Sequence, residues 1–118
     1  MRILLALILC LPSAVSAQSW SLREGDQVFE QTSLDARLRG ETLTFFDNGQ
    51  SEFYSDGRYT YTYANDGGVG YGYYEVMTDS SVCIEFVNGF SRCDAYVLDA
   101  AGRLVVVTEA GDRFPVRP

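Results

Sequence analysis

The sequence predicts a mainly β protein: an antiparallel meander of about eight strands, forming a small barrel or a curled sheet, with one short helix near the N-terminus. The stretch from Phe45 to Tyr74 alternates aromatic with small or polar residues, which is the period-two pattern of strands. Asp-Asn-Gly, Asp-Gly and Asn-Asp-Gly-Gly interrupt it at short intervals, as hairpin turns do. Links this short place successive strands antiparallel.

The first seventeen residues are typical of a secretory signal peptide. Arg2 precedes an apolar run over 3–11, and the segment ends with small residues at Val15-Ser16-Ala17. The run is too short to cross a bilayer, which takes about twenty residues. We therefore expect no membrane span and an exported chain, periplasmic or extracellular, in which residues 18–118 form a single β-domain.

One short helix is expected at about 32–39. Thr32 occupies the N-cap position with Asp35 three residues later, and Leu34 and Leu38 share one face. Gly40 follows where a helix would stop. A helix this short is unstable alone, so we expect it to dock through its two leucines across an open end of the sheet.

The strands are expected to fill the rest of the chain, from about 41 to 116. Their predicted ranges are 41–46, 51–55, 58–64, 69–77, 82–87, 90–97, 103–109 and 112–116. The apolar run 104–107 should be the most deeply buried strand, and Trp20 should cover one end of the core. Pro115 suits only an edge or terminal strand, so a barrel closed in part is an alternative to a closed one.

Two cysteines are expected to form a disulfide. Cys10 leaves with the signal peptide, unless it is the acylated residue of a lipoprotein signal, so the exported chain keeps Cys83 and Cys93. A two-residue turn at Asn88-Gly89 would point the two thiols to opposite faces of the sheet. A three-residue loop over 87–89, with Gly89 in a left-handed conformation, places the cysteines opposite each other. We predict this second register and the disulfide.

The composition narrows the possible functions. The formal net charge is −7, and the chain contains neither lysine nor histidine, so it has no broad basic face for nucleic acid or an anionic membrane. Without histidine, a nucleophile lacks its usual base and a metal site its commonest ligand. We expect no catalytic residue, metal or cofactor. A carboxylate pair such as Glu75 and Glu85 is a catalytic alternative, although sixteen acids make chance pairs common.

Tyrosines are abundant and gather on two adjacent strands. Tyr59, Tyr61 and Tyr63 share one face of their strand, and Tyr71 and Tyr73 share one face of the next. If Asp66-Gly67 centres the turn between them, Tyr61 faces Gly72 and Tyr63 faces Gly70, and the rings cover glycines that would otherwise weaken the sheet. The alternative is an exposed stacking platform for a sugar or a peptide.

Several residues carry a resemblance to small exported bacterial proteins of uncharacterised function. The shared features are Leu38-x-Gly40-x-Thr42, the aromatic strands around 55–59 and 72–76, Val82-Cys83-x-x-Phe86 with Cys93, and Ala101-Gly102-Arg103. The resemblance implies a helix followed by a β-meander with a two-cysteine hairpin, and export. In addition, Ser55-Asp56-Gly57-Arg58-Tyr59 is similar to the Ser-Gly-x-x-Tyr inhibitory loop of periplasmic inhibitors of C-type lysozyme, with different spacing.

These observations favour a noncatalytic exported β-domain, expected to be a monomer, that binds an envelope protein or a cell-wall glycan. An inhibitor of a secreted hydrolase such as lysozyme is the first alternative, and a carboxylate-based hydrolase is the second. The candidate binding residues are Arg58, Tyr59, Tyr61, Tyr63, Tyr71 and Tyr73.

Overall fold

The computed structural model describes residues 19–118, so the predicted signal peptide and Cys10 lie outside the described residues. The elements in chain order are β1 (Gln27–Val28), α1 (Gln31–Leu38), β2 (Thr42–Thr44), β3 (Gln50–Phe53), β4 (Arg58–Thr62), β5 (Val69–Val76), β6 (Ser81–Phe86), β7 (Ser91–Leu98), β8 (Leu104–Val107) and β9 (Arg113–Pro115). Each predicted strand lies within two residues of its observed position.

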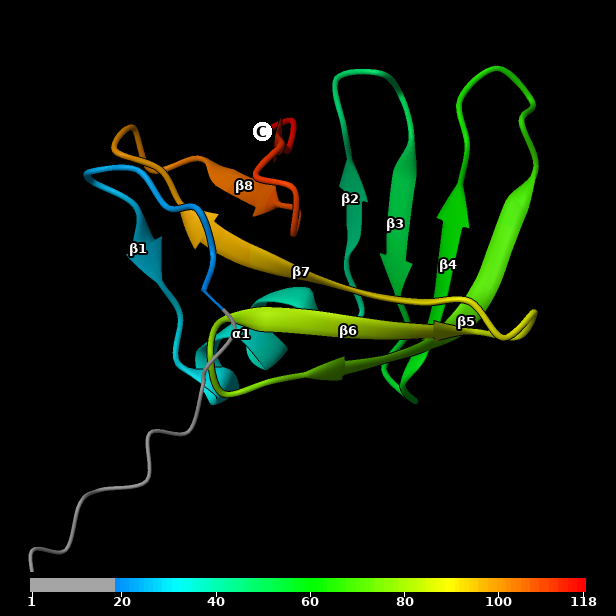
Figure 1. Ribbon diagram of the computed structural model, residues 1–118. Coiled ribbons are helices and arrows are strands. Elements are labelled where there is room, and N and C mark those ends of the chain that lie inside the picture. Colours follow the sequence, from blue (N-terminus) through cyan, green and yellow to red (C-terminus); the bar gives the residue numbers. More distant parts are fainter. Residues whose placement is uncertain (1–18) are drawn as a thin grey trace, which may run out of the picture.

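Strands β2 to β9 form one antiparallel meander, in which every strand pairs with the next one in sequence. In Figure 1, β2, β3 and β4 stand side by side, and β5 bends from them toward β6 and β7. This bend curls the sheet into a half-barrel, which confirms the predicted fold class. The short strand β1 pairs with β7 at Gln27–Leu98 and Val28–Val97.

The two edges of the half-barrel touch along a short seam. Phe45, next to β2, forms an isolated antiparallel bridge with Val116, next to β9. The Arg117 backbone N–H donates to the Thr44 carbonyl oxygen at 2.8 Å, and its guanidinium donates to the Phe45 and Phe46 carbonyl oxygens. Pro115 is in the terminal strand, as predicted. The barrel is therefore closed in part.

Helix α1 covers one end of the half-barrel. Leu34 and Leu38 are fully buried, and Gly40 ends the helix with a φ of +80°. The helix begins at Gln31, not at Thr32, and its N-cap is Glu30, which makes no side-chain capping bond. The predicted capping role of Thr32 is therefore wrong. A tertiary contact holds the first residue of the helix instead: the side-chain amide of Gln31 donates from Nε2 to the Val76 carbonyl oxygen at 2.9 Å.

The main core lies inside the half-barrel, on the side of α1. Phe53 is at its centre, only 1% exposed, and its ring packs edge-on against Tyr59 and Tyr74 with centroids 5.2 and 5.1 Å apart. The Tyr96 ring lies 6.2 Å away on a third side. These contacts make the helix end of the half-barrel a filled core.

A second cluster lies on the outer face of the sheet. All four residues of β8 are buried, as predicted, because Leu104 and Val106 face the main core while Val105 and Val107 pack on the outer face against Ala95 and Val97. Trp20 covers this outer cluster, so its predicted place at an end of the core is wrong. Its indole N–H donates to the Asp79 carboxylate at 3.2 Å.

The β6–β7 hairpin contains the predicted disulfide in the predicted register. Cys83 pairs with Cys93, with Cα atoms 4.0 Å apart. The Phe86 N–H donates to the Phe90 carbonyl oxygen at 2.8 Å, and Gly89 has a φ of +88°. The three-residue loop therefore aligns the cysteines as the sequence predicted.

Replacing both Cys83 and Cys93 with serine should lower the free energy of unfolding by about 2.5–3 kcal/mol, because the bond closes a loop of ten residues and restricts the unfolded chain. Urea denaturation of the wild-type and the double variant measures this difference. Wild-type protein with the disulfide reduced is the control for the substituted side chains, because it lacks the bond and keeps both cysteines. An unchanged stability of the double variant would show that the unfolded chain is already restricted.

The β4–β5 hairpin differs from its predicted register by two residues. Its turn is centred on Asn65 and Asp66, which both have a φ of 57°, and not on Asp66-Gly67. Tyr59 therefore faces Gly72 and Tyr61 faces Gly70. A shift of two residues preserves the face of every side chain, so the inward set of tyrosines is unchanged.

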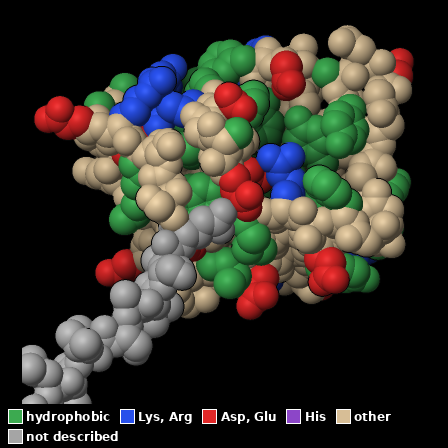
Figure 2. All heavy atoms as spheres, in the orientation of Figure 1, with side chains coloured by type: hydrophobic (Ala, Val, Ile, Leu, Met, Phe, Trp, Pro, Cys, Tyr) green, Lys and Arg blue, Asp and Glu red, His purple; other side chains and the backbone are tan. Residues whose placement is uncertain are grey.

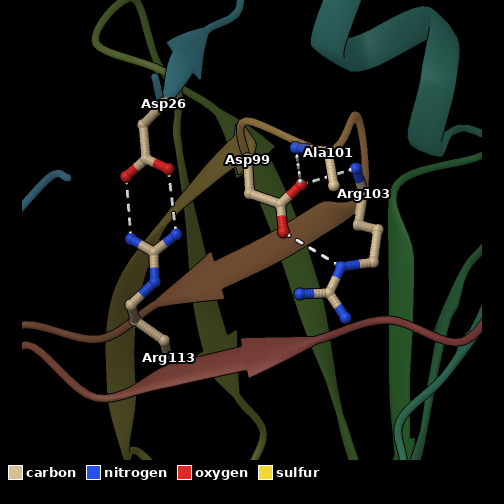
Figure 3. Close-up of polar contacts among 5 residues, drawn as sticks. All are labelled: Asp26, Asp99, Ala101, Arg103 and Arg113. Atoms are coloured by element: carbon tan, nitrogen blue, oxygen red, sulfur yellow. Dashed lines mark hydrogen bonds and ion pairs between the residues drawn. The ribbon is translucent and has the colours of Figure 1, made fainter. Parts of the chain in front are cut away.

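An ion pair ties the N-terminal segment to the last strand. The Arg113 guanidinium donates two hydrogen bonds to the Asp26 carboxylate, at 2.7 and 2.9 Å (Figure 3). Both side chains are buried, with 1% exposure for Asp26 and 12% for Arg113. Asp99 and Arg103 form a second pair beside it. These charges line a hollow of about 430 Å³ on the outside of the sheet, where they neutralise one another.

Candidate ligand-binding site

A cavity of about 500 Å³ opens at the end of the half-barrel opposite α1. We call it the mouth cavity. Its buried lining residues are Phe45, Ser51, Tyr59, Ile84, Asp94, Tyr96 and Val106, and its exposed rim residues are Asp47, Tyr63, Val69, Asn88, Phe90 and Phe114. Between these two levels lie the partly exposed Tyr61, Gly70, Phe86 and Thr108 and the Arg92 side chain. Its volume is within the range of about 300–1,000 Å³ that is usual for small-ligand sites.

The cavity exists because small or polar residues occupy inward positions in this half of the sheet. Three of these positions are occupied by Ser51, Gly70 and Thr108. At the helix end of the half-barrel, inward positions are occupied by large apolar side chains. The Phe86 ring partly covers Gly70: a Cβ added to Gly70 would lie 3.2 Å from Cε1 of Phe86. These three small or polar residues leave space that the surrounding aromatic rings do not fill.

Aromatic rings form much of the wall and rim. The Tyr61 and Tyr63 rings meet edge to face with centroids 4.8 Å apart, and the Phe86 and Phe90 rings lie 6.2 Å apart. Tyr63, Phe90 and Phe114 are exposed. Figure 2 shows hydrophobic side chains gathered in the region of β3, β4 and β5, with acidic side chains spread around them.

An ion pair lies inside the half-barrel, on β7. The Arg92 guanidinium donates from Nε and Nη2 to the two carboxylate oxygens of Asp94, both at 2.8 Å. The Asp94 side chain is 8% exposed and that of Arg92 is 46% exposed. These hydrogen bonds raise the pKa of Arg92, so its positive charge is retained.

Neutral hydroxyl groups accompany this ion pair at the bottom of the cavity. The Ser51 and Tyr59 hydroxyl oxygens share a hydrogen bond of 2.8 Å. Burial raises the pKa values of both Tyr59 and Tyr96 well above the usual range, so both phenols stay protonated. The bottom of the cavity therefore presents hydrogen-bond donors and acceptors with no net charge beyond the neutralised pair.

The predicted binding residues divide between the two faces of the sheet. Tyr59, Tyr61 and Tyr63 line the mouth cavity. Tyr71 and Tyr73 are exposed on the outer face of β5. Arg58 pairs with Tyr73 across that face and forms an exposed ion pair with Asp56. Tyr59 is 4% exposed, so it supports the cavity and cannot project from the loop at 55–58.

That burial bears on the loop resembling the lysozyme inhibitors. Ser55 and Asp56 are exposed, whereas the Tyr59 ring packs 5.2 Å from that of Phe53 in the core. An inhibitory loop of that kind would need its tyrosine at the surface. The segment forms a tight turn: the Gly57 N–H donates to the Tyr54 carbonyl oxygen at 3.1 Å.

The sequence-based prediction of binding residues did not include most of the polar residues that line the cavity, above all Arg92 and Asp94. A signal was present, because side chains alternate along a strand. In β6 the apolar residues Val82 and Ile84 alternate with Cys83, which assigns Cys83 and its disulfide partner Cys93 to the outer face. The neighbours of Cys93, Arg92 and Asp94, must then face inward together with Tyr96. Two opposite charges on the inward face of a small β-domain would have indicated the site.

The carboxylate pair suggested by the sequence does not form a sheltered site. Glu75 pairs with Cys83, and Glu85 pairs with Tyr73; both glutamates are exposed on the outer face. Within residues 19–118, no three His, Cys, Asp or Glu side chains come together in a way that could hold a metal ion. No helix in that same part of the chain is long and apolar enough to span a membrane.

Comparisons with protein-family models, with curated proteins and with solved structures found no match to this chain. The functional argument therefore rests on the mouth cavity and its residues.

Proposed function

We propose that this chain is a noncatalytic, exported binding module, and that its mouth cavity receives a compact amphipathic group. The group is either a small molecule or the exposed end of a cell-wall component. The sequence of residues 1–17 and the disulfide between Cys83 and Cys93 are both compatible with export.

The observation that carries the proposal is the open cavity with an ion pair inside it. A domain under selection for stability alone would fill this space, because unfilled volume and buried charges both cost free energy. Here the exposed rings of Tyr63, Phe90 and Phe114 surround the opening. Apolar walls with a few convergent polar groups are the usual features of a small-ligand site.

A matched pair of tyrosines tests whether the mouth cavity is the site. Tyr63 on the rim is 56% exposed, and Tyr71 on the outer face is 57% exposed. With the neutral fluorophore 1-N-phenylnaphthylamine as probe, Tyr63→Ala should weaken binding about two- to twelvefold, because an aromatic contact is worth roughly 0.5–1.5 kcal/mol. Tyr71→Ala should leave the affinity within twofold. Fluorescence titration measures both.

The reverse pattern, with Tyr71→Ala the more damaging change, would move the site to the outer tyrosine platform. Equal losses for the two variants would contradict a site at the mouth. Circular dichroism of each variant confirms that the fold is intact.

A further inference from the structure

We infer that the group received by the mouth cavity is an uncharged saccharide unit. This inference rests on the proposed function and adds the chemical class of the ligand. It follows from three features of the lining: a neutralised ion pair with unused donors, hydroxyl groups beside it, and aromatic faces above it.

The ion pair leaves hydrogen-bond donors free. Arg92 uses Nε and Nη2 for Asp94, and its Nη1 makes no hydrogen bond to another residue in the described range 19–118. Because the Arg92 side chain is 46% exposed within the lining, these donors can reach an acceptor on a ligand. The planar, fixed arrangement of the guanidinium favours ligands with closely spaced oxygens.

The charge of the pair argues against an anionic ligand. Asp94 already balances the charge of Arg92 through two hydrogen bonds. Among the described lining residues Arg92 is the single cation, and Asp47 adds a negative charge at the rim. The formal net charge of the whole chain is −7, which repels anions at long range. A carboxylate or phosphate would therefore gain little at this site.

The polar bottom of the cavity argues against a purely apolar ligand. An acyl chain reaching Arg92, Asp94 and the Ser51–Tyr59 hydroxyl pair would remove water from these groups without replacing its hydrogen bonds, and such a loss is costly. Ligand hydroxyls restore those hydrogen bonds, because each can both donate and accept.

The aromatic walls complete the match. A pyranose ring has flat faces of C–H groups and an edge of hydroxyl groups. The Tyr61 and Phe86 rings offer apolar surfaces to the C–H faces of the sugar. The protein hydroxyls at the bottom of the cavity and the Arg92 guanidinium offer hydrogen-bond partners to the sugar hydroxyls. Because the cavity is open on one side, further units of a glycan can extend past the rim residues Tyr63 and Phe90 into solvent.

Nuclear magnetic resonance titration of the protein tests the ligand class. The probes are the neutral disaccharides cellobiose, lactose and N,N′-diacetylchitobiose, the sugar acid glucuronate, and 1-octanol as an apolar chain. At least one neutral disaccharide should shift the backbone signals of β4, β6 and β7 around the cavity in a saturable way. Glucuronate should bind at least tenfold more weakly than that disaccharide.

A variant with an uncharged lining separates sugar recognition from general binding. Arg92→Met alone would leave Asp94 buried without a partner and could unfold the chain, so the test uses Arg92→Met with Asp94→Leu. This double variant should bind the disaccharide at least tenfold more weakly and 1-N-phenylnaphthylamine within threefold of wild type. The control is Arg58→Met with Asp56→Leu, which removes the exposed pair with the same spacing and should change neither.

The outcomes distinguish the inference from the proposed function. If 1-octanol displaces 1-N-phenylnaphthylamine and no disaccharide binds, the cavity is a binding site but the saccharide inference is wrong. The same conclusion follows if the uncharged double variant binds the disaccharide as tightly as wild type. If neither 1-N-phenylnaphthylamine nor any of the disaccharides binds at the mouth, the proposed function fails.

Discussion

Replacing Phe53 with alanine should lower the free energy of unfolding by about 3–5 kcal/mol, the range observed for large-to-small changes at buried aromatic positions. Phe53 is 1% exposed, and the rings of Tyr59, Tyr74 and Tyr96 contact it from three sides. Removal of its ring leaves a cavity that these side chains, each held in a strand, cannot fill. Urea or thermal unfolding measures the loss.

The matched control for Phe53→Ala is Phe90→Ala on the rim, where the ring is exposed. This change should lower the stability by less than about 1 kcal/mol, because most of the ring already contacts water. Similar losses for the two variants would contradict the location of the core at the helix end. Since Tyr59 and Tyr96 also line the mouth cavity, Phe53→Ala should weaken ligand binding as well.

Replacing Asp26 with alanine should lower the free energy of unfolding by about 1.5–3 kcal/mol, because it removes two hydrogen bonds between charged groups and leaves the part-buried Arg113 without its partner. The pair joins residues that are 87 positions apart in the chain. Asp56→Ala, which breaks the exposed pair with Arg58, is the control and should change the stability little. If the two variants lost similar amounts of stability, the burial of the Asp26–Arg113 pair would contribute nothing to the free energy of unfolding.

The contribution of Asp26 should depend on pH. Hydrogen bonds from Arg113 lower the pKa of Asp26 below its usual value of 3.8. A carboxyl group with a lowered pKa in the folded state stabilises that state fully above the usual value and loses this effect as the pH falls through the lowered pKa. The stability difference between wild type and Asp26→Ala should therefore be constant at neutral pH and shrink in acid below pH 3.8. A difference that grows in acid would contradict this.

Local patterns in the sequence were sufficient to predict the meander. Turn residues located the strands of the meander, and alternation placed Tyr59, Tyr61 and Tyr63 on one face, so the β4–β5 register could be wrong by two residues while these three tyrosines still shared a face. The disulfide register followed from geometry around Gly89 alone. These features depend on neighbours in the chain, which is why they could be predicted.

Features made by distant residues could not be predicted in the same way. Gln31 sets the start of α1 through Val76, and Trp20 packs on the outer cluster because β1 lies along β7. The site depended on both kinds of information. Its tyrosines were found from alternation, whereas the contribution of Phe45 and Phe114 to the same cavity required the curl of the whole sheet.

The seam between the two edges of the half-barrel also determines the order in which the molecule assembles. Every other pair of neighbouring strands in the meander is joined by a short turn, whereas the seam joins Arg117 to Phe45 across 72 residues. Closing so long a loop costs the most chain entropy of any step in the meander, so hairpins form first and the seam closes last. By the same reasoning we expect the seam to open before any hairpin does. Because Phe45 of the seam also lines the mouth cavity, an open seam would widen that cavity while the hairpins stay paired.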